Sequence, residues 1–215
     1  MNDEMQDRGF PLTALREIKY LSQLNHPNIV SIKQVLNSKP CESNGHRGSY
    51  FLLFDYLNFD LIGLRNKNIL LTVPQLKCIM QQLLRGLVYL HKDKWICHRD
   101  IKGANILLSK SGEVRITDFG LARVLNPMVS TNNYTTRVVT LWYRSHELLL
   151  GKRDYDFGVD IWSLACVFIE LVTGFVIFQA NDELNAIKKI WSVLGTVNAQ
   201  NMPGFAQLRN YHGFN

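Results

Sequence analysis

Residues 98–105 read HRDIKGAN and residues 118–120 read DFG, and these two stretches decide the fold. In the first stretch a carboxylate (Asp100), an ammonium group (Lys102) and a carboxamide (Asn105) stand at positions 0, +2 and +5, so one loop can bring all three to a single point. A second carboxylate, Asp118, follows thirteen residues after Asn105. Gly120 suits the sharp backbone turn that would aim Asp118 at the same point.

These side chains match the needs of phosphoryl transfer. That reaction requires a group that orients the attacking hydroxyl, a cation at the moving phosphoryl group and oxygen ligands for Mg²⁺. An HRD tripeptide or a DFG turn alone is a weak signal, but here the two occur in the expected order around a predicted hairpin. The sequence therefore predicts a phosphoryl-transfer site.

The chain around this site alternates between helical and strand patterns. Apolar spacing predicts helices over residues 11–25, 73–92, 157–173 and 181–194, and strands over 28–36, 50–57, 106–109 and 113–117. The Ser111-Gly112 pair between the last two strands indicates a hairpin turn. We expect a small mixed front part followed by a mostly helical remainder.

Composition excludes several classes of protein. Of the 215 residues 47% are hydrophobic and 20% are charged, which is enough apolar material for a core and argues against disorder. The net charge of +6 includes no run of more than two Lys or Arg, so we expect no direct contact with nucleic acid. The longest apolar stretch, residues 161–172, is shorter than the ~20 residues of a membrane span, so it predicts a buried helix and no membrane partner. The first ten residues show no secretory signal, and the four cysteines are widely spaced, which favours an intracellular, disulfide-free and zinc-free protein.

On its HRD…N and DFG motifs the chain resembles the eukaryotic protein kinases. The resemblance implies that Asp100 orients and deprotonates a Ser/Thr hydroxyl, that Lys102 steadies the γ-phosphate, and that Asn105 and Asp118 bind Mg²⁺. It thus implies ATP and Mg²⁺ as cofactors. The lysine two places after Asp100 is similar to the serine/threonine kinase pattern.

The same resemblance gives a nucleotide pocket. The strand up to Leu57 is similar to the kinase hinge strand, with Phe54 as gatekeeper and with backbone groups of Asp55 and Leu57 meeting the adenine. By resemblance Asp60 lies near the ribose and Leu107 forms the floor beneath the base. From the residues alone, this is only a buried strand and a buried leucine.

Two further positions are structural in this reading. Asp160, in the sequence DIWS, resembles the first residues of the central large-lobe helix, where it would hold the catalytic-loop backbone because an unpaired buried carboxylate is costly. His98 is interpreted as a residue packed near Phe119 rather than as an acid–base catalyst.

Residues 11–17, PLTALRE, are close to the PITAIRE and PITALRE variants of the cyclin-binding helix in cyclin-dependent kinases. Further matches are DFGLAR (118–123), VVTLWYR (138–144) and ELLLG (147–151). The combination is most similar to the transcription-elongation kinases of that family, which phosphorylate the C-terminal repeats of RNA polymerase II. This implies a cyclin-like partner, protein substrates with Ser/Thr-Pro sites and a nuclear location.

Regulation can also be read from the resemblance. Thr135 matches the activating phosphorylation site, and Arg16, Arg99 and Arg123 match the pocket that receives the phosphate. Val138 would shape the site that favours proline after the phosphorylated residue. On charge alone, a solvated basic face is the favoured interpretation of the cations between residues 99 and 153, and a phosphate site is the alternative.

The chain departs from the kinase pattern at several places. It has no G-x-G-x-x-G loop, and residues 1–16 contain no lysine, so Glu17 lacks its usual partner, for which Lys33 is a poor substitute. Ser145-His146 replaces the usual small residue and proline before Glu147, whose usual arginine partner is also absent. The expected fold is therefore α+β: a two-lobe kinase fold with an incomplete small lobe over residues 1–57 and a mainly helical large lobe, lacking its last helices, over 58–215.

Two functional hypotheses follow. In the first, the chain is an incomplete piece of an ATP-dependent, proline-directed serine/threonine kinase of the cyclin-dependent type, inactive on its own. In the second, it is a non-catalytic kinase-like fragment that binds a cyclin or a substrate. The complete set of Asp100, Lys102, Asn105 and Asp118 favours the first, and the missing strand lysine favours the second.

Overall fold

The computed structural model describes residues 12–39, 41–42, 50–125, 134–136, 138–198 and 200. Its α-helices are α1 (Leu12–Leu21), α2 (Leu61–Asn66), α3 (Val73–Val88), α4 (His146–Leu149), α5 (Gly158–Thr173) and α6 (Glu183–Leu194). Its strands are β1 (Ile32–Asn37), β2 (Tyr50–Phe54), β3 (Phe59–Asp60), β4 (Ile96–Cys97), β5 (Ile106–Leu108), β6 (Val114–Ile116) and β7 (Arg123–Val124). Single turns of other helices occur at η3 (Tyr89–Asp93, π), η4 (Gly103–Asn105, 3-10) and η5 (Leu141–Tyr143, 3-10).

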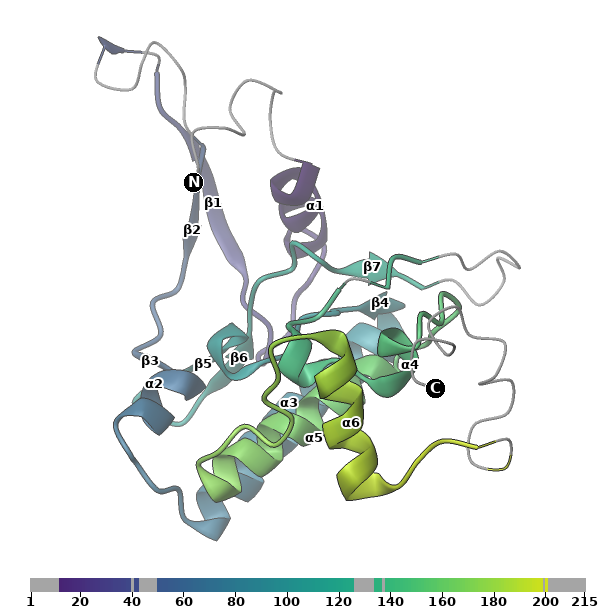
Figure 1. Cartoon of the computed structure of the whole chain (residues 1–215). Helices are drawn as coiled ribbons and strands as arrows, with labels where there is room; N and C mark the ends of the chain where they lie inside the picture. Colours follow the sequence, from purple (N-terminus) through teal and green to yellow (C-terminus); the bar gives the residue numbers. More distant parts are fainter. Residues whose placement is uncertain are drawn as a thin grey trace.

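The front part of the chain is a two-stranded ribbon with one helix beside it. Strands β1 and β2 pair antiparallel from Ile32 opposite Phe54 to Asn37 opposite Tyr50, and together with α1 they stand apart from the helical part (Figure 1). Both faces of the ribbon are open to solvent. Five of its large apolar side chains are 42 to 56% exposed: Val35, Leu36, Tyr50, Phe51 and Leu53.

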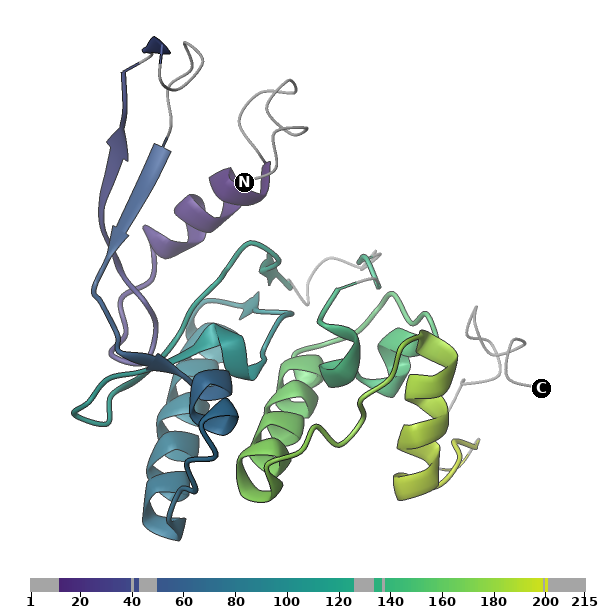
Figure 2. The same cartoon turned by 60° about the vertical axis from the view of Figure 1, so that its left-hand side comes forward.

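The helical part is built around α3 and α5, which lie side by side (Figure 2), with α6 on the far side against α4 and η5. Residues of both helices, among them Leu83, Leu87 and Leu164, belong to one buried cluster. The two helices therefore share one core. The expected burial of the 161–172 stretch holds for one face only, because Phe168 and Val172 are 41% and 52% exposed.

Helix α3 shows how local signals fix an element. At its start the side chain of Gln75 accepts a hydrogen bond of 2.8 Å from the backbone N–H of Thr72, and a proline occupies the first turn, where it costs no hydrogen bond. The predicted helix over 73–92 is α-helical only to Val88, because the chain then widens into the π-helical turn η3. In this turn His91 reaches Asp160 of α5.

The strands differ from the sequence expectation at their ends. The predicted strand over 28–36 begins only at Ile32, because residues 28–30 instead pair with β6: Ile29 forms a parallel bridge with Ile116, and the Val30 N–H donates to the Ile116 carbonyl at 3.0 Å. The strand predicted over 50–57 ends at Phe54. The hairpin around residues 111–112 is confirmed, with β5 and β6 antiparallel. Within the described ranges, no helix combines the length and apolar character that a membrane crossing requires.

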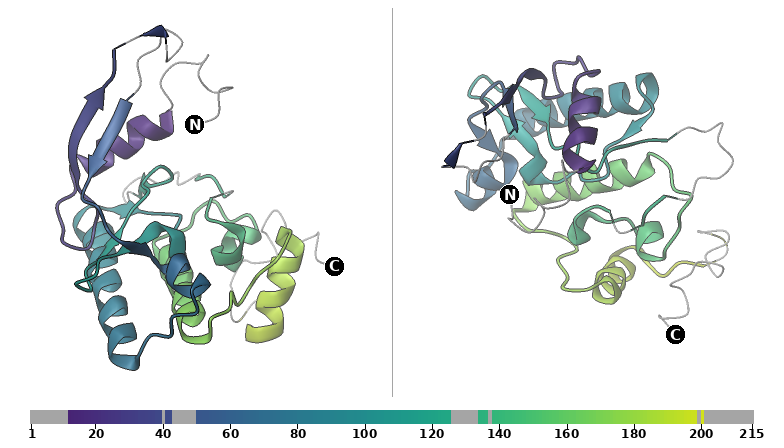
Figure 3. Two further views of the ribbon diagram at one scale, coloured as in Figure 1. Left: turned by 90° about the vertical axis from the view of Figure 1, so that its left-hand side faces the viewer. Right: turned by 90° about the horizontal axis from the view of Figure 1, so that it is seen from above.

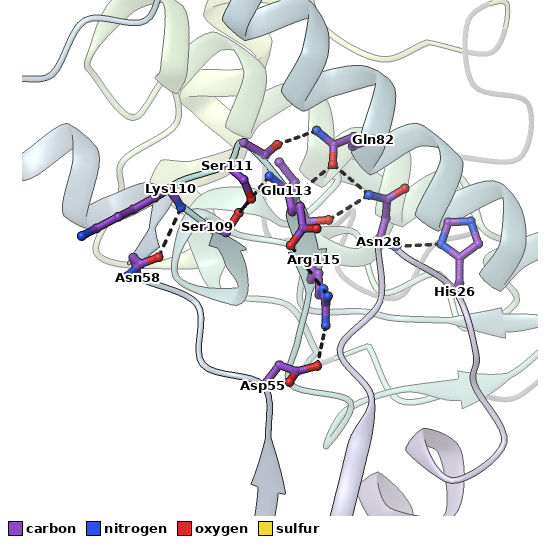
Figure 4. Close-up of polar contacts among 12 residues, drawn as sticks. His26, Asn28, Asp55, Asn58, Gln82, Ser109, Lys110, Ser111, Glu113 and Arg115 are labelled. Atoms are coloured by element: carbon purple, nitrogen blue, oxygen red, sulfur yellow. Dashed lines mark hydrogen bonds and ion pairs between the residues drawn. The ribbon is translucent and has the colours of Figure 1, made fainter.

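A buried polar network attaches the segment before β1 to the helical part (Figure 4). The amide nitrogen of Asn28 donates to the Gln82 side chain at 3.0 Å and to the Val114 carbonyl at 2.9 Å. Gln82 in turn accepts from the Val114 N–H and donates to the Gly112 carbonyl. Gly86 permits this close approach, since a Cβ there would lie 3.3 Å from the Asn28 carbonyl oxygen. Figure 3 shows the outcome: α1 and the ribbon meet the helical part near β5 and β6.

We predict that Asn28→Ala lowers the thermal midpoint by roughly 2–12 °C. The change leaves buried partners unsatisfied at about 1–3 kcal/mol, and each kcal/mol shifts the midpoint of a chain of this length by roughly 2–4 °C. The measurement is thermal unfolding followed by circular dichroism. Asn25→Ala, at an exposed position three residues earlier, is the control and should change little. Equal midpoints for the two variants would contradict the anchoring role of Asn28.

Candidate active site

Asp100 is the centre of a closed network of hydrogen bonds. Its Oδ2 accepts from Nζ of Lys102 at 2.7 Å and from the amide nitrogen of Asn105 at 3.0 Å. Its Oδ1 accepts from both the N–H and the hydroxyl of Thr140, each at 3.1 Å. Lys102 also donates to the Thr140 hydroxyl at 3.0 Å. The structure thus brings together the three predicted residues of the catalytic loop and adds Thr140.

This network keeps Asp100 ionised. The residue is 5% exposed, and burial alone would raise its pKa. The hydrogen bond and the charge of Lys102, with the hydrogen bonds from Thr140, lower the pKa below its ordinary value instead. At neutral pH the carboxylate can therefore accept a proton from a hydroxyl that displaces one of its present donors.

Asp160 holds the backbone that carries Asp100. Its two oxygens accept from the N–H groups of His98 and Arg99, each at 2.8 Å, and one of them also contacts Nε2 of His91 at 2.8 Å. Arg99 has a φ of +67°, which is unfavourable for a residue with a side chain. The fully buried carboxylate compensates for that strain, and the expected role of Asp160 is present in the structure.

His98 is a packed structural residue, as expected. Its ring meets the ring of Phe119 edge-on, with centroids 4.9 Å apart. Nδ1 of His98 accepts from the Asp100 N–H at 3.2 Å, so the proton of the neutral ring sits on Nε2, which donates to the Thr117 carbonyl at 2.9 Å. Both ring nitrogens of His98 therefore form hydrogen bonds with backbone groups.

Asn105 and Asp118 supply oxygen atoms that suit Mg²⁺. The amide nitrogen of Asn105 is used twice, toward the carbonyl and the carboxylate of Asp100, whereas no hydrogen bond among the described residues uses its amide oxygen. The Thr117 N–H donates to the Asn105 carbonyl at 3.0 Å, and exposed Asp118 is the next residue along the chain. Asp118 has a φ of +65°, and its carboxylate accepts from the Gly120 N–H at 3.3 Å. A carboxylate and an amide oxygen are the hard donors that Mg²⁺ prefers.

The residues predicted to bind the nucleotide lie on β2, on β3, on β5 and in the connection between β2 and β3. Phe54 ends β2 and packs against the core, and Leu57 is half-buried in the connection to β3. Asp55 turns its side chain to Lys33 and, at 3.2 Å, to Arg115 (Figure 4). Lys33 is therefore not a partner of Glu17, as expected.

Asp60 and Leu107 face each other across β3 and β5. Asp60 also caps α2, because its Oδ1 accepts from the Gly63 N–H at 2.6 Å. One oxygen of this carboxylate is thus already engaged by the helix it begins. The ribose contact of Asp60 and the adenine contacts of its neighbours stay predictions.

Glu17 sits against the DFG turn. Burial, and then the negative charge of Asp118, raise its pKa, while a hydrogen bond from the Phe119 backbone opposes the rise. Among the described residues, no Lys or Arg forms an ion pair with Glu17. Glu147, also expected to lack its arginine, has His146 Nδ1 at 3.7 Å.

The three predicted arginines lie near one another, beside the segment that follows the DFG turn. Burial lowers the pKa of Arg16, and the nearby charges of Arg123 and Arg99 lower it further, so the three guanidinium groups share one region. Arg99 donates to the Leu121 carbonyl at 2.7 Å, and Arg16 donates to the Gly120 carbonyl at 3.4 Å. Both contacts hold these cations close to the segment that follows the DFG turn.

Thr135 is exposed and tied to this cluster by a tyrosine. The hydroxyl of Tyr155 donates to the Thr135 carbonyl at 2.9 Å and accepts from Nη1 of Arg99 at 2.8 Å. The hydroxyl of Thr135 is therefore accessible, while its backbone is anchored near one of the three arginines.

Sequence reasoning missed Thr140 and Tyr155. Thr140 lies in the VVTLWYR motif, but its contact with Asp100 spans 40 residues, and only the fixed spacing after Thr135 could have indicated it. No local signal marks Tyr155 as the partner of Arg99, which is 56 residues away.

Comparison with protein families matches residues 1–208 to the family described as Protein kinase domain. The chain belongs to the protein kinase family. Its relatives include Cyclin-dependent kinase C-1 of Oryza sativa subsp. japonica (42% identity, covering 96% of this chain and 41% of that protein) and human Cyclin-dependent kinase 9 (42%, covering 93% and 54%). The crystal structure of the yeast RNA Pol II CTD kinase CTDK-1 complex matches with a TM-score of 0.86 at 40% identity, covering 96% of this chain and 64% of that one.

These matches confirm the expected resemblance to cyclin-dependent kinases and the mixed α and β kinase fold. The chain spans about half the length of the curated relatives it matches. The roles of the individual site residues remain predictions that the geometry now makes specific.

We predict that Glu17→Gln raises the thermal midpoint at pH 8 by roughly 1–2 °C, equivalent to about 0.5 kcal/mol. Folding raises the pKa of Glu17, so the folded protein binds this proton more tightly than the unfolded chain does. The ionised residue therefore destabilises the fold at high pH, and this penalty disappears as the pH falls through the folded pKa. The increase in thermal midpoint that Glu17→Gln gives should therefore be smaller at pH 5 than at pH 8.

The matched control for this prediction is Glu113→Gln, at an exposed position. It should change the midpoint less, at either pH. A Glu17→Gln variant that melts at or below the parent temperature at pH 8 would show that its carboxylate is compensated by a cation.

Proposed function

We propose that this chain carries the catalytic site of an ATP-dependent, proline-directed serine/threonine kinase of the cyclin-dependent type. The observation that carries the proposal is the arrangement around Asp100: one ionised carboxylate, bound at both oxygens, beside Lys102 and Asn105. Asp118 directly follows Thr117, whose N–H donates to the Asn105 carbonyl. The division into a small lobe over 1–57 and a large lobe over 58–215 is part of this proposal.

In the proposed reaction Asp100 accepts the proton of a substrate hydroxyl and orients its oxygen for attack. The hydroxyl takes the place of one donor on the carboxylate, most simply that of Lys102, whose ammonium group then turns to the transferred phosphoryl group. Asn105 and Asp118 would hold Mg²⁺, which when bound neutralises charge on the phosphates. ATP would lie along the residues from Phe54 to Leu107.

A preference for proline is supported by the geometry after Thr135. Val139 has a φ of +64°, an outlier for a β-branched residue. Arg144 donates to the carbonyls of Val138 and Val139 at 2.9 and 3.1 Å. These carbonyls are therefore already engaged, and the N–H of a peptide residue placed there would lose its hydrogen bond with water. Proline has no N–H and incurs no such loss.

The similarity to cyclin-dependent kinases supports a cyclin as the partner, docked on α1. The similarity to a structure titled RNA Pol II CTD kinase supports Ser-Pro repeats of that polymerase as substrate, and with them a nuclear location. A specific observation favours the alternative, a non-catalytic fragment that binds a cyclin or substrate: Glu17 has no ion pair with a Lys or Arg of the described residues, and Lys33 is paired with Asp55.

We predict that residues 1–215 alone transfer negligible phosphate. The same chain supplemented with a Gly-rich loop, a strand lysine, C-terminal helices and a cyclin should phosphorylate a Ser-Pro peptide. Asp100→Asn should lower this transfer by at least about 100-fold, because a positioned base contributes roughly 10²–10⁴-fold. A Ser-Ala peptide should react roughly 5- to 150-fold more slowly, from about 1–3 kcal/mol for an unpaired N–H.

The assay is transfer of radiolabelled phosphate, and Asp154→Asn, at an exposed site, is the matched control. Equal transfer by the parent and by Asp100→Asn would remove the catalytic assignment. Cyclin binding without transfer by any form would favour the non-catalytic alternative.

We also predict that phosphorylation of Thr135 slows tryptic cleavage between residues 118 and 147 by at least about tenfold when a cyclin is bound. The phosphate can accept charge-assisted hydrogen bonds from Arg16, Arg99 and Arg123, each worth roughly 1.5–3 kcal/mol. Thr135→Ala should abolish the protection, whereas Thr136→Ala, one residue later, should retain it. Equal cleavage of phosphorylated and unphosphorylated protein would exclude the arginine pocket.

A further inference from the structure

Glu170 is a buried carboxylate with partners on two distant segments. It lies on α5 and is 4% exposed. One of its oxygens forms an ion pair with Nη1 of Arg65 on α2, and the other accepts a hydrogen bond of 2.6 Å from the hydroxyl of Tyr143. Because a buried carboxylate is costly without compensating partners, the positions of these three side chains depend on one another.

Tyr143 brings this contact to the substrate side of the candidate active site. It is the last residue of η5, and its carbonyl accepts from the hydroxyl of Ser163 at 2.8 Å. Its N–H donates to the carbonyl of Thr140, the residue that holds Asp100, at 2.9 Å. The next residue, Arg144, holds the two carbonyls that we associate with proline. A displacement of Tyr143 would therefore move both contacts.

Arg65 stands at the other end of the network, on a helix that touches the catalytic turn. Helix α2 packs on η4 so closely that a Cβ at Gly103 would lie 3.0 Å from Cγ1 of Ile62. The side chain of Arg65 is 26% exposed, whereas that of Glu170 is 5% exposed. The network thus connects the two flanks of Asp100, the catalytic turn on one side and Thr140 on the other.

The chemistry of the three groups suits positioning better than stabilisation. A buried ion pair adds little stability compared with apolar residues of the same volume. It does impose direction, because a carboxylate held by a guanidinium at one oxygen can receive a hydroxyl at the other in a narrow range of geometry. Burial, and then the hydrogen bond to Glu170, raise the pKa of Tyr143, so its hydroxyl stays a donor at physiological pH.

We propose that Arg65 is a positioning residue for the peptide substrate. It neutralises Glu170, Glu170 holds Tyr143, and Tyr143 keeps residues 138–144 where they align Asp100 and receive the residue after the phosphorylated one. The peptide in this inference rests on the proposed function, whereas the link from Arg65 to the segment can be tested without it.

The test compares the parent chain with Arg65→Leu, Arg65→Lys and Tyr143→Phe. Amide hydrogen exchange is measured by mass spectrometry over residues 138–144 and, as an internal reference, over 79–87 of α3. Affinity for a labelled Ser-Pro peptide is measured by fluorescence anisotropy, and affinity for ATP in parallel.

We expect Arg65→Leu to speed exchange over residues 138–144 by about tenfold or more, with α3 unchanged. Peptide affinity should fall by about tenfold while ATP affinity stays the same, and Arg65→Lys should lie closer to the parent because it keeps the charge. Tyr143→Phe removes one oxygen atom and should also speed amide exchange over residues 138–144. This variant tests the same network if Arg65→Leu does not fold.

Unchanged exchange over residues 138–144, or equal acceleration in α3, would overturn the proposal. The proposal would also be overturned if Arg65→Lys and Arg65→Leu exchanged the amide hydrogens of residues 138–144 equally fast. Neutralisation of Glu170 would then not be the cause of the slow exchange in the parent chain. If no form binds the peptide, including the parent, the proposed function fails, and the exchange result still decides whether Arg65 holds the segment.

Discussion

The structure depends on the buried carboxylate of Asp160 and the two backbone N–H groups that it accepts. These bonds allow Arg99 to keep a positive φ, and this turn of the backbone sends the Arg99 side chain to one side and Asp100 to the other. On one side Arg99 donates to the hydroxyl of Tyr155, which in turn donates to the carbonyl of Thr135. On the other side Asp100 gathers its donors. A single residue of α5 therefore holds both the reacting group and the anchor of the regulatory segment, and neither could be moved alone.

The sequence was most informative where function requires a fixed spacing of unlike residues. The positions of Asp100, Lys102 and Asn105 within one loop predicted their convergence, and the costly burial of a carboxylate predicted that Asp160 would find backbone partners. Long periodic segments were also informative, because the apolar face of α3 repeats over four turns. In these cases the physical constraint acts within one segment or one motif, so that it can be read from a single stretch of chain.

The contacts that could not be predicted join segments far apart and follow from packing. Thr140, Gln82 and Tyr143 are ordinary residues in sequence, and each gains its role only because another element presents an unpaired group beside it. The ends of the strands were missed for a related reason. Ile29 and Val30 have the apolar character of a strand, but residues 28–30 pair with β6 instead of extending the pairing of β1 with β2.

The ribbon of β1 and β2 has a consequence for how the chain fares in a cell. A two-stranded ribbon is marginal in water, and this one leaves apolar side chains such as Phe51 and Leu53 about half exposed. Strands with open edges and apolar faces pair readily with other chains, which leads to aggregation unless something covers them. Molecular chaperones and proteases act on such surfaces, so an uncovered ribbon exposes the chain to both, however stable the helical core is.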